Sequence, residues 1–326
     1  MLIHTRIFCL MVMLPLSYII SQESEAPSQP SPKGKEQTLE PTLLRFGGEK
    51  NFLLTHLSEL PPKIDPLETE VNYPALGGIG VGLLGAAYGV QVYQQNAWWK
   101  DQRTKFHILN DWGYALWIDK IGHLYGTALI AHVFSAGLEG ANVQAEANVW
   151  YSSALALSFQ LFVEVQDGFG PQWGFSPGDA GSDVLGAAFP ILQYYYPYLN
   201  NFKFKFSYYP ADLTKKNPNS GQTHIIIDDY AGQKFWLSMR MKNILPERVS
   251  QYWPEFLCLA LGMGVKNLDG SGGGQRDFYL AFDLDAETIP LHGKFWQFVK
   301  NTLNYFHFPM PGIRLTNKVV FFVLAY

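Results

Sequence analysis

Acidic side chains and His123 are concentrated in the segment 119–183, among long apolar runs. The segment contains a single cation, Lys120. Burying a carboxylate without a partner is costly, so a chain that keeps several of them in apolar surroundings is expected to use them. The chemistry open to such groups is proton transfer or the binding of a metal ion. The acidic residues and the histidine are Asp119, His123, Glu139, Glu146, Glu164, Asp167, Asp179 and Asp183.

Six of these residues have the spacing of neighbours on a helix face. Residues three or four positions apart lie on the same side of a helix. The pairs with this spacing are Asp119 with His123, Glu164 with Asp167, and Asp179 with Asp183. Carboxylates from several helices together with one imidazole are able to bind a divalent metal ion. All six are therefore candidate metal ligands.

Three of the same residues are candidates for catalysis. A carboxylate beside His123 would orient its imidazole for acid/base work. Glu164 would act as a base if desolvation and neighbouring acids raised its pKa, and Asp167 lies one helical turn away. Several specific enzymes are excluded, because the sequence has no His-Glu-x-x-His zinc motif, no Gly-x-Ser-x-Gly elbow and no Walker loop.

Four uncharged runs predict the helices that position these groups: residues 75–92, 121–138, 147–163 and 184–201. Each is near the length that spans a bilayer. The first contains two small-xxx-small glycine pairs, which favour close helix packing in membranes. Polar residues interrupt the other three, which also suits a buried bundle in a soluble domain. We expect a membrane-associated bundle of about four helices over residues 71–201.

Local signals set the ends of these helices. Ser176 suits an N-cap, Pro177 suits the first helical position, and Asp179 falls at N3, where an acid faces the helix dipole. A capping role is thus an alternative duty for Asp179. Asp119 is a candidate cap for the helix over 121–138, and Gly168 is a stop for the helix before it. Glu139 and Glu146 are expected in the loop between two helices.

The pattern changes after residue 201. Phe202-Lys-Phe-Lys-Phe-Ser alternates apolar and polar residues, which predicts a half-exposed strand. Further strands are expected at 224–227, 237–241, 278–284 and 318–326, and a helix at 294–306. The predicted fold class is α+β, with the helical bundle followed by a small, mainly antiparallel β region over 202–326. Five or six strands are too few for a closed membrane barrel.

The N-terminus and the composition indicate export. His4 and Arg6 precede an uncharged run, so residues 1–21 are predicted to be a signal peptide and residues 22–70, rich in Ser, Pro and Glu, a disordered linker and lead-in. Charged residues make up only 16% of the chain, which suits contact with membrane lipid. The net charge of -4 argues against nucleic acid as a partner, and the sequence shows no nucleotide site.

The ordered motifs resemble a known family. They read Asp119-Lys-Ile-Gly-His123, then Glu164-x-x-Asp167, then Gly174-Phe-Ser-x-x-Asp179-x-x-x-Asp183-x-x-Gly-Ala187. This order resembles the bacterial envelope family called domain of unknown function 2279, whose members include predicted periplasmic lipoproteins, over roughly residues 105–200. It is similar, more loosely, to VanZ-like membrane proteins. Cys9 lacks the small residues that precede a lipidated cysteine, so this sequence departs from the lipoprotein pattern of the family. The resemblance implies a site but no activity.

Three functions remain open from the sequence. The first is a cell-envelope membrane protein with a conformational or interaction role, organised around the buried Asp/Glu/His cluster, with other envelope proteins as candidate partners. The second is a metal-dependent or acid/base hydrolase acting on a lipid-linked or cell-wall substrate. The third is an outer-membrane β-rich binding module, in which Asp228, Asp229, Tyr230 and Trp236 would form the binding surface.

Overall fold

The computed structural model describes residues 70–97, 103–210, 226–227, 229–269, 272–316 and 318–326. These residues belong to one compact unit, residues 62–326. The predicted signal peptide with Cys9, the predicted linker up to residue 69, and Asp228 lie outside the described residues, as do the first two residues of the strand expected at 224–227. The other two residues of that strand form a turn.

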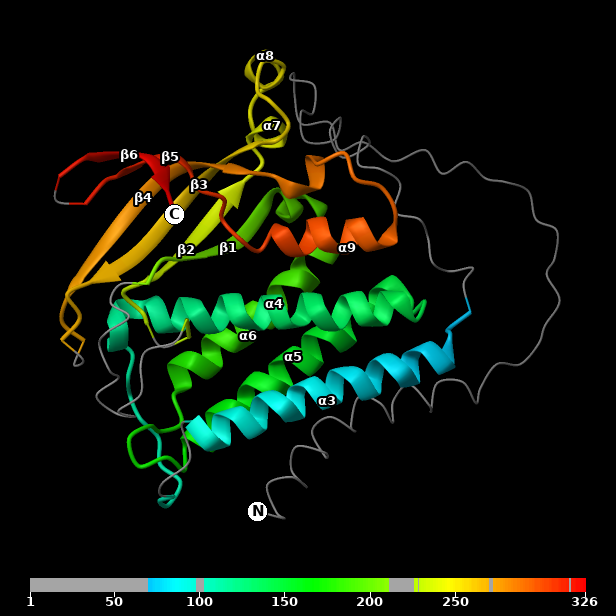
Figure 1. Cartoon of the computed structure of the whole chain (residues 1–326), viewed down its shortest axis with the longest axis vertical. Coiled ribbons are helices and arrows are strands. Elements are labelled where there is room, and N and C mark those ends of the chain that lie inside the picture. The colour runs from blue at the N-terminus through cyan, green and yellow to red at the C-terminus, as the bar shows by residue number, and fades with distance from the viewer. Residues whose placement is uncertain (1–69, 98–102, 211–225, 228, 270–271, 317) are drawn as a thin grey trace, which may run out of the picture. The chain divides into compact units, whose positions relative to one another are not determined.

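The described residues confirm the α+β fold class, with helices first and a sheet after them (Figure 1). The α-helices are α3 Tyr73–Ala97, α4 Ile118–Gly140, α5 Ala145–Asp167, α6 Pro177–Tyr195, α7 Met241–Ile244, α8 Glu247–Ser250 and α9 Lys294–Leu303. The strands are β1 Phe202–Tyr208, β2 Gln233–Met239, β3 Leu257–Lys266, β4 Gln275–Leu284, β5 Met310–Arg314 and β6 Val320–Ala325. Short 3-10 turns occur at Tyr114–Trp117, Pro197–Asn201 and Ala286–Thr288.

Most helix boundaries agree with the sequence signals. Ser176 is the N-cap of α6 and its hydroxyl oxygen accepts from the Asp179 amide at 3.1 Å. Gly168 is the C-cap of α5. The prediction that Asp119 caps its helix was wrong, because Trp117 holds the N-cap position of α4. The run expected to be helical to residue 201 ends its α-helix at Tyr195, before a 3-10 turn that begins with Pro197.

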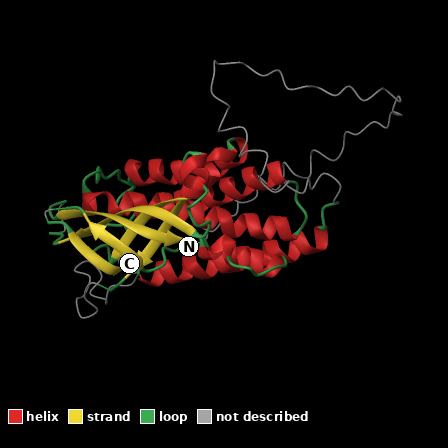
Figure 2. Cartoon of the chain, turned by 90° about the horizontal axis from the view of Figure 1, so that it is seen from above, coloured by secondary structure: helices red, strands yellow, loops and turns green. Residues whose placement is uncertain are grey.

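The sheet is antiparallel throughout, in the order β1-β2-β3-β4-β5-β6, and lies against the helices (Figure 2). Ile118 and Tyr125 of α4 pack with Phe235 of β2 and Val265 of β3, which joins the helices to the sheet in one apolar core. The Tyr125 hydroxyl donates to the Tyr305 carbonyl at 2.8 Å. Burying this side of α4 fixes the rotation of the helix and so directs the residues on its other sides.

The prediction that β1 is half-exposed was wrong, although its alternation is real. Phe204 and Phe206 face the helical core, but the opposite face of the sheet is also covered. The Lys205 side chain is only 1% exposed, and its ammonium lies 2.7 Å from Asp283 Oδ2. The ammonium also donates to the Leu284 carbonyl at 2.7 Å. Alternation shows that a strand has two different faces; it does not show that the polar face meets water.

Two strands, β3 and β5, were not predicted. β3 reads Leu-Cys-Leu-Ala-Leu-Gly-Met-Gly-Val-Lys and has no polar residue until its end, so no alternation marks it. β5 contains Pro311 and Gly312, which normally argue against a strand. Gly262 of β3 is explained by packing, because a side chain there would overlap the Trp236 ring. The Trp236 ring stacks on His307, with centroids 3.9 Å apart.

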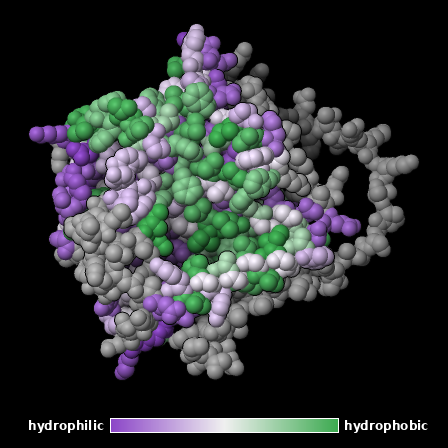
Figure 3. All heavy atoms as spheres, viewed as in Figure 1, coloured by the Kyte–Doolittle hydropathy of each residue, from purple (hydrophilic) through white to green (hydrophobic). Residues whose placement is uncertain are grey.

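Two described helices are long and apolar enough to cross a membrane, residues 73–96 and 114–140. The sequence predicted four such runs. Only 6% of the most apolar window of residues 73–96 is buried, although Leu76 and Ile79 pack near the end of α4. Helix α4, by contrast, packs against α5, α6 and the sheet. Figure 3 shows apolar residues gathered over the face that carries α3, α9 and β6. Val81 of α3, Phe295 of α9 and Val323 of β6 are exposed.

Helices α4 and α6 approach closely at Gly186. A Cβ added there would overlap the Leu124 carbonyl oxygen and lie 2.9 Å from the Thr127 Cβ. We expect Gly186→Ala to lower the free energy of unfolding by about 1–3 kcal/mol, because a tightly packed contact has no room for a methyl group. Gly181→Ala is the matched control on the same helix, since it meets nothing within 4 Å. Urea unfolding monitored by tryptophan fluorescence measures both, and equal effects would contradict this account.

Candidate metal centre

Three helices bring one acidic cluster together. α4 supplies Asp119, Lys120 and His123, the end of α5 supplies Glu164, and the start of α6 supplies Asp179 and Asp183. Asp111, from the segment before α4, completes it. The cluster divides into two parts by its contacts. The lysine group is Asp111, Asp119, Lys120 and Asp179, and the histidine group is His123, Glu164 and Asp183.

The lysine group is a closed ion-pair network. The Lys120 ammonium lies 2.6 Å from Asp111 Oδ2, 3.2 Å from Asp119 Oδ2 and 3.0 Å from Asp179 Oδ1. Burial alone would lower the pKa of Lys120, but Asp119 and Asp179 more than offset this and raise it above its ordinary value. The lysine is therefore charged at every physiological pH. It ties α4 to the start of α6 and to the segment before α4.

The histidine group has no lysine or arginine of its own. His123 Nδ1 lies 3.1 Å from Asp183 Oδ1, and His123 Nε2 lies 3.6 Å from Glu164 Oε1. The Glu164 side chain is 3% exposed and the Asp183 side chain is not exposed at all. The His123 side chain is 21% exposed, so the group is open to solvent on the imidazole side. One side-chain atom from each residue lies within 4.8 Å of the others, which is close enough to share a metal ion.

Asp183 is the most buried member of the histidine group and its two oxygens differ. Oδ1 faces three donors: Thr127 Oγ1 at 2.8 Å, Gln160 Nε2 at 3.3 Å and His123 Nδ1 at 3.1 Å. Oδ2 is buried and has no hydrogen-bond partner among the described residues. A buried carboxylate oxygen without a donor is costly. Such an oxygen is a ready ligand for a cation.

Bound protons offset the negative charge of the histidine group, which has no lysine or arginine of its own. Desolvation raises the pKa of Glu164 to about 9; His123 opposes the rise, whereas Asp179, Asp167 and Asp183 add to it. Burial lowers the pKa of His123, but Asp183, Asp119 and Asp179 raise it well above its ordinary value. At neutral pH the metal-free site therefore holds protons on both Glu164 and His123. A divalent cation would replace them.

Ser176 links the two groups. Its hydroxyl donates to Asp111 Oδ1 at 2.6 Å and accepts from the Asp179 amide, and its own amide donates to Glu164 Oε2 at 3.2 Å. One N-cap residue thus contacts two carboxylates, one from each group, and the backbone amide of Asp179. The helix that it starts also carries Asp183, one turn further along the same face.

A strained turn leads into the cluster. Ala115, Leu116 and Trp117 have positive φ angles of 45°, 54° and 79°, which residues other than glycine rarely adopt. Arg276 holds this turn, because its Nε donates to the Leu116 carbonyl at 3.0 Å and its guanidinium lies 4.7 Å from the centre of the Trp117 ring. The sheet therefore fixes the turn from which Asp119 and Lys120 emerge.

The structure brings together five of the six residues proposed from the sequence: Asp119, His123, Glu164, Asp179 and Asp183. Asp167 belongs to neither group; it is the last residue of α5 and interacts with Arg103. Asp179 serves both as an N3 residue and as a Lys120 partner. Glu139 and Glu146, expected in a loop, lie instead within the ends of α4 and α5.

Sequence reasoning missed Asp111 and the role of Tyr230. Asp111 lies outside the helices and eight residues before the first spaced pair, so no periodicity marks it. Tyr230 was proposed for an exposed binding surface with Asp229 and Trp236, and that surface was wrong. Asp229 and Trp236 are 7% and 1% exposed, and the Tyr230 hydroxyl donates to Asp119 Oδ1 at 2.8 Å.

Comparisons with known proteins address the helical part alone. Neither the curated proteins nor the solved structures gave a match. The looser similarity to VanZ-like membrane proteins is not confirmed. Residues 109–195, which contain both the lysine group and the histidine group, match the family described as predicted periplasmic lipoprotein (DUF2279).

Proposed function

We propose that this protein is an envelope protein whose histidine group binds a divalent transition-metal ion. Two observations carry the proposal: one ligand atom from each of His123, Glu164 and Asp183 lies within 4.8 Å of the others, and Asp183 Oδ2 is buried without a donor among the described residues. One imidazole and two carboxylates suit Zn²⁺, Mn²⁺ or Fe²⁺ better than Mg²⁺ or Ca²⁺, which prefer oxygen ligands alone. The family description agrees with export to the cell envelope.

The lysine group has a different role in this proposal. Asp119, His123 and Asp179 also lie within metal-binding reach of one another. However, both carboxylates already contact the Lys120 ammonium. A second cation there would face Lys120 and be repelled by it. We assign the lysine group to structure and the histidine group to the metal, so that the network holds the helices at the spacing that the ligands need.

Membrane association enters the proposal through α3. This helix has no charged residue over 25 positions, and only 6% of its most apolar window is buried. An exposed apolar helix of that length is suited to lipid. α4 carries the cluster and is covered by α5, α6 and the sheet, so we place lipid against α3 and not against α4.

Metal analysis of the full chain tests the site. After purification in detergent and treatment with chelator, the protein is titrated with Zn²⁺ or Mn²⁺ and the bound metal is counted by elemental analysis. We expect one ion per chain. His123→Ala and Asp183→Asn should each weaken binding by more than the roughly 10–100-fold that follows loss of an outer-shell partner. Asparagine keeps the shape of the Asp183 side chain, so that variant separates ligation from packing.

Two matched controls sharpen this experiment. Asp167→Asn removes an acid that the sequence proposed as a ligand but that belongs to neither metal-binding group. His107→Ala removes a histidine outside the cluster, whose Nδ1 lies 3.3 Å from the Lys105 carbonyl. Both should keep one ion per chain with nearly unchanged affinity. Absence of metal from the wild type, or equal binding by His123→Ala, would defeat the proposal.

Metal-assisted hydrolysis is a second candidate function, favoured by the partial exposure of His123. Three protein ligands leave a coordination position for water, as catalytic zinc sites do. The metal would supply an activated water, and Glu164, once deprotonated, would stay in the ligand set. Hydrolysis of bis-p-nitrophenyl phosphate or p-nitrophenyl acetate, dependent on added metal and lost in Asp183→Asn, would support this candidate. A loaded protein that hydrolyses neither compound would remain a metal-binding protein only.

A further inference from the structure

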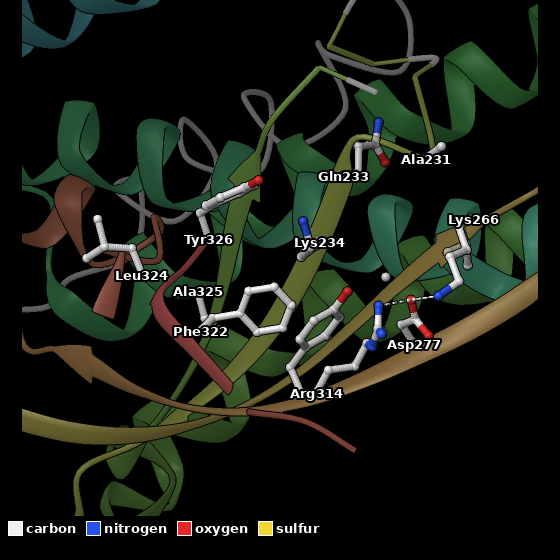
Figure 4. Close-up of a pocket in the computed structure, with 13 residues that line it drawn as sticks. Ala231, Gln233, Lys234, Lys266, Asp277, Arg314, Phe322, Leu324, Ala325 and Tyr326 are labelled. Atoms are coloured by element: carbon white, nitrogen blue, oxygen red, sulfur yellow. Dashed lines mark ion pairs between the residues drawn. The ribbon is translucent and has the colours of Figure 1, made fainter. Parts of the chain in front are cut away.

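A second site lies in the sheet, on the face opposite the helical core. A cavity of about 240 Å³ opens between β2, β3, β4 and the end of β6 (Figure 4). Phe235 points from β2 into the helical core, so its neighbour Lys234 points to the cavity side. None of the acidic cluster lines this cavity. The site is therefore separate from the candidate metal centre.

The side chains around the cavity carry excess positive charge. Lys234, Lys266 and Arg314 line it against one acid, Asp277. Lys266 Nζ pairs with Asp277 Oδ2 at 2.7 Å, and Arg314 Nη1 lies 3.7 Å from the same oxygen. One carboxylate thus serves two cations. Figure 4 shows Asp277 between Lys266 and Arg314, with Lys234 on the far side of the cavity.

Lys234 has no paired carboxylate among the described residues, and Arg314 shares its acidic partner, Asp277, with Lys266. The Lys234 ammonium lies 4.7 Å from the centre of the Tyr326 ring. Burial lowers the pKa of Lys234, and Asp277 opposes that only in part. Arg314 Nε is buried without a hydrogen-bond partner in the described chain. A buried donor and a desolvated ammonium beside one cavity both favour an anionic ligand.

The walls indicate the shape of the ligand. Tyr279, Phe322 and Tyr326 line the cavity, and Lys234 also lies 5.9 Å from the centre of the Tyr279 ring. Aromatic faces bind the carbon body of a ligand, while the cations bind its anionic end. Leu324, at the rim, is 58% exposed. An anion attached to an apolar body fits both features.

We propose that this cavity, the β2–β6 pocket, binds a phosphate group through Lys234 and Arg314. Three cationic side chains against one acidic side chain leave two positive side-chain charges, which match a phosphate with about 1.5–2 negative charges at pH 7. Arginine and lysine are the usual phosphate-binding side chains. The phosphate belongs either to a small soluble ester or to a lipid headgroup, since the chemistry at the cations is the same for both.

Binding to the full chain tests the proposal with two probes, the first in detergent and the second after the detergent has been removed. The first is inorganic phosphate, followed by calorimetry in the millimolar range. The second is vesicles of phosphatidylcholine with or without phosphatidic acid, followed by co-sedimentation. We expect Lys234→Gln to weaken phosphate binding about tenfold or more. Lys242→Gln is the control of equal charge, because that ammonium donates to the Ser250 carbonyl, outside the pocket.

The outcomes separate the two sources of phosphate. Inorganic phosphate binding that is weakened in Lys234→Gln supports a soluble ester. Binding that requires phosphatidic acid and is weakened in the same variant supports a lipid headgroup. Lys234 has no ion-pair partner among the described residues. Its replacement therefore leaves no buried carboxylate without its cation, and the variant should fold. Failure to bind either probe, or equal binding by the Lys234→Gln and Lys242→Gln variants, overturns the proposal.

Discussion

Lys120→Met is expected to be among the most destabilising substitutions in the chain. It leaves Asp111, Asp119 and Asp179 without the cation that lies 2.6–3.2 Å from each of them. Removing one partner of a buried ion pair costs about 3–5 kcal/mol, because the other charge stays buried and unpaired. Here a single cation serves three carboxylates, so the cost should reach the upper end of that range. Urea unfolding monitored by far-UV circular dichroism measures it.

Two further variants distinguish loss of charge from loss of packing. Lys242→Met removes a lysine whose contact is a carbonyl, and it should change the free energy of unfolding by less than about 1 kcal/mol. Adding Asp119→Asn and Asp179→Asn to Lys120→Met removes two of the orphaned charges and should restore part of the stability. If Lys120→Met lowered the free energy of unfolding no more than Lys242→Met does, the lysine group would not be the structural element described above.

The metal-free protein is expected to lose stability as the pH rises from about 5 to 9. Glu164 has a pKa of about 9 in the folded chain against an ordinary value of 4.5. Between these values the unfolded chain ionises and the folded chain does not, so stability falls by about 1.4 kcal/mol per pH unit. The raised pKa of His123 acts in the same direction, because its stabilising charge is lost at high pH. Asp179, whose pKa desolvation raises to about 6, adds to the fall below pH 6.

Thermal unfolding at pH 6 and at pH 8.5, in chelator, measures this dependence. Glu164→Gln should flatten it, since glutamine cannot ionise. Metal affinity should show the opposite trend and rise with pH, because binding must displace protons from Glu164 and His123. Calorimetry in buffers of different ionisation enthalpy counts the protons released. A metal-free stability that rises between pH 6 and 8.5, or binding that releases no proton, would contradict the assigned protonation states.

The sequence predicted the helices, and which acids lie close together, well, because both depend on local signals. Uncharged runs located the helices, and Ser176 with Pro177 located the start of α6. Spacing of three and four residues selected the acids, and five of the six chosen residues converge. The spacing of residues along one helix does not show, however, which of them contact the neighbouring helices. Asp167 has the same spacing to Glu164 as a true partner would, yet it lies at the end of α5, nearest Arg103.

The remaining features depend on contacts between distant segments. The role of Lys120 follows from Asp111 and Asp179, which lie on two other segments, so no local pattern pairs them. The covered second face of the sheet follows from the chain after α9, which brings His307 onto Trp236. The alternating pattern in β1 does not indicate that another segment will cover the polar face of the strand. Strand β3 was missed for a related reason: apolar residues stand on both of its faces, so its sequence does not alternate, although Leu261 on one face is 47% exposed.

Lys205 sets the order in which the C-terminal half is able to fold. Its ammonium contacts Leu284, 79 residues later, and Asn304, 99 residues later. A lysine that enters an apolar interior before its partners are in place is strongly unfavourable, and contacts over such separations form slowly. Strand β1 therefore cannot dock stably while the chain is still emerging. We expect this half of the protein to fold in one late, cooperative step, after the residues through Asn304 have left the ribosome.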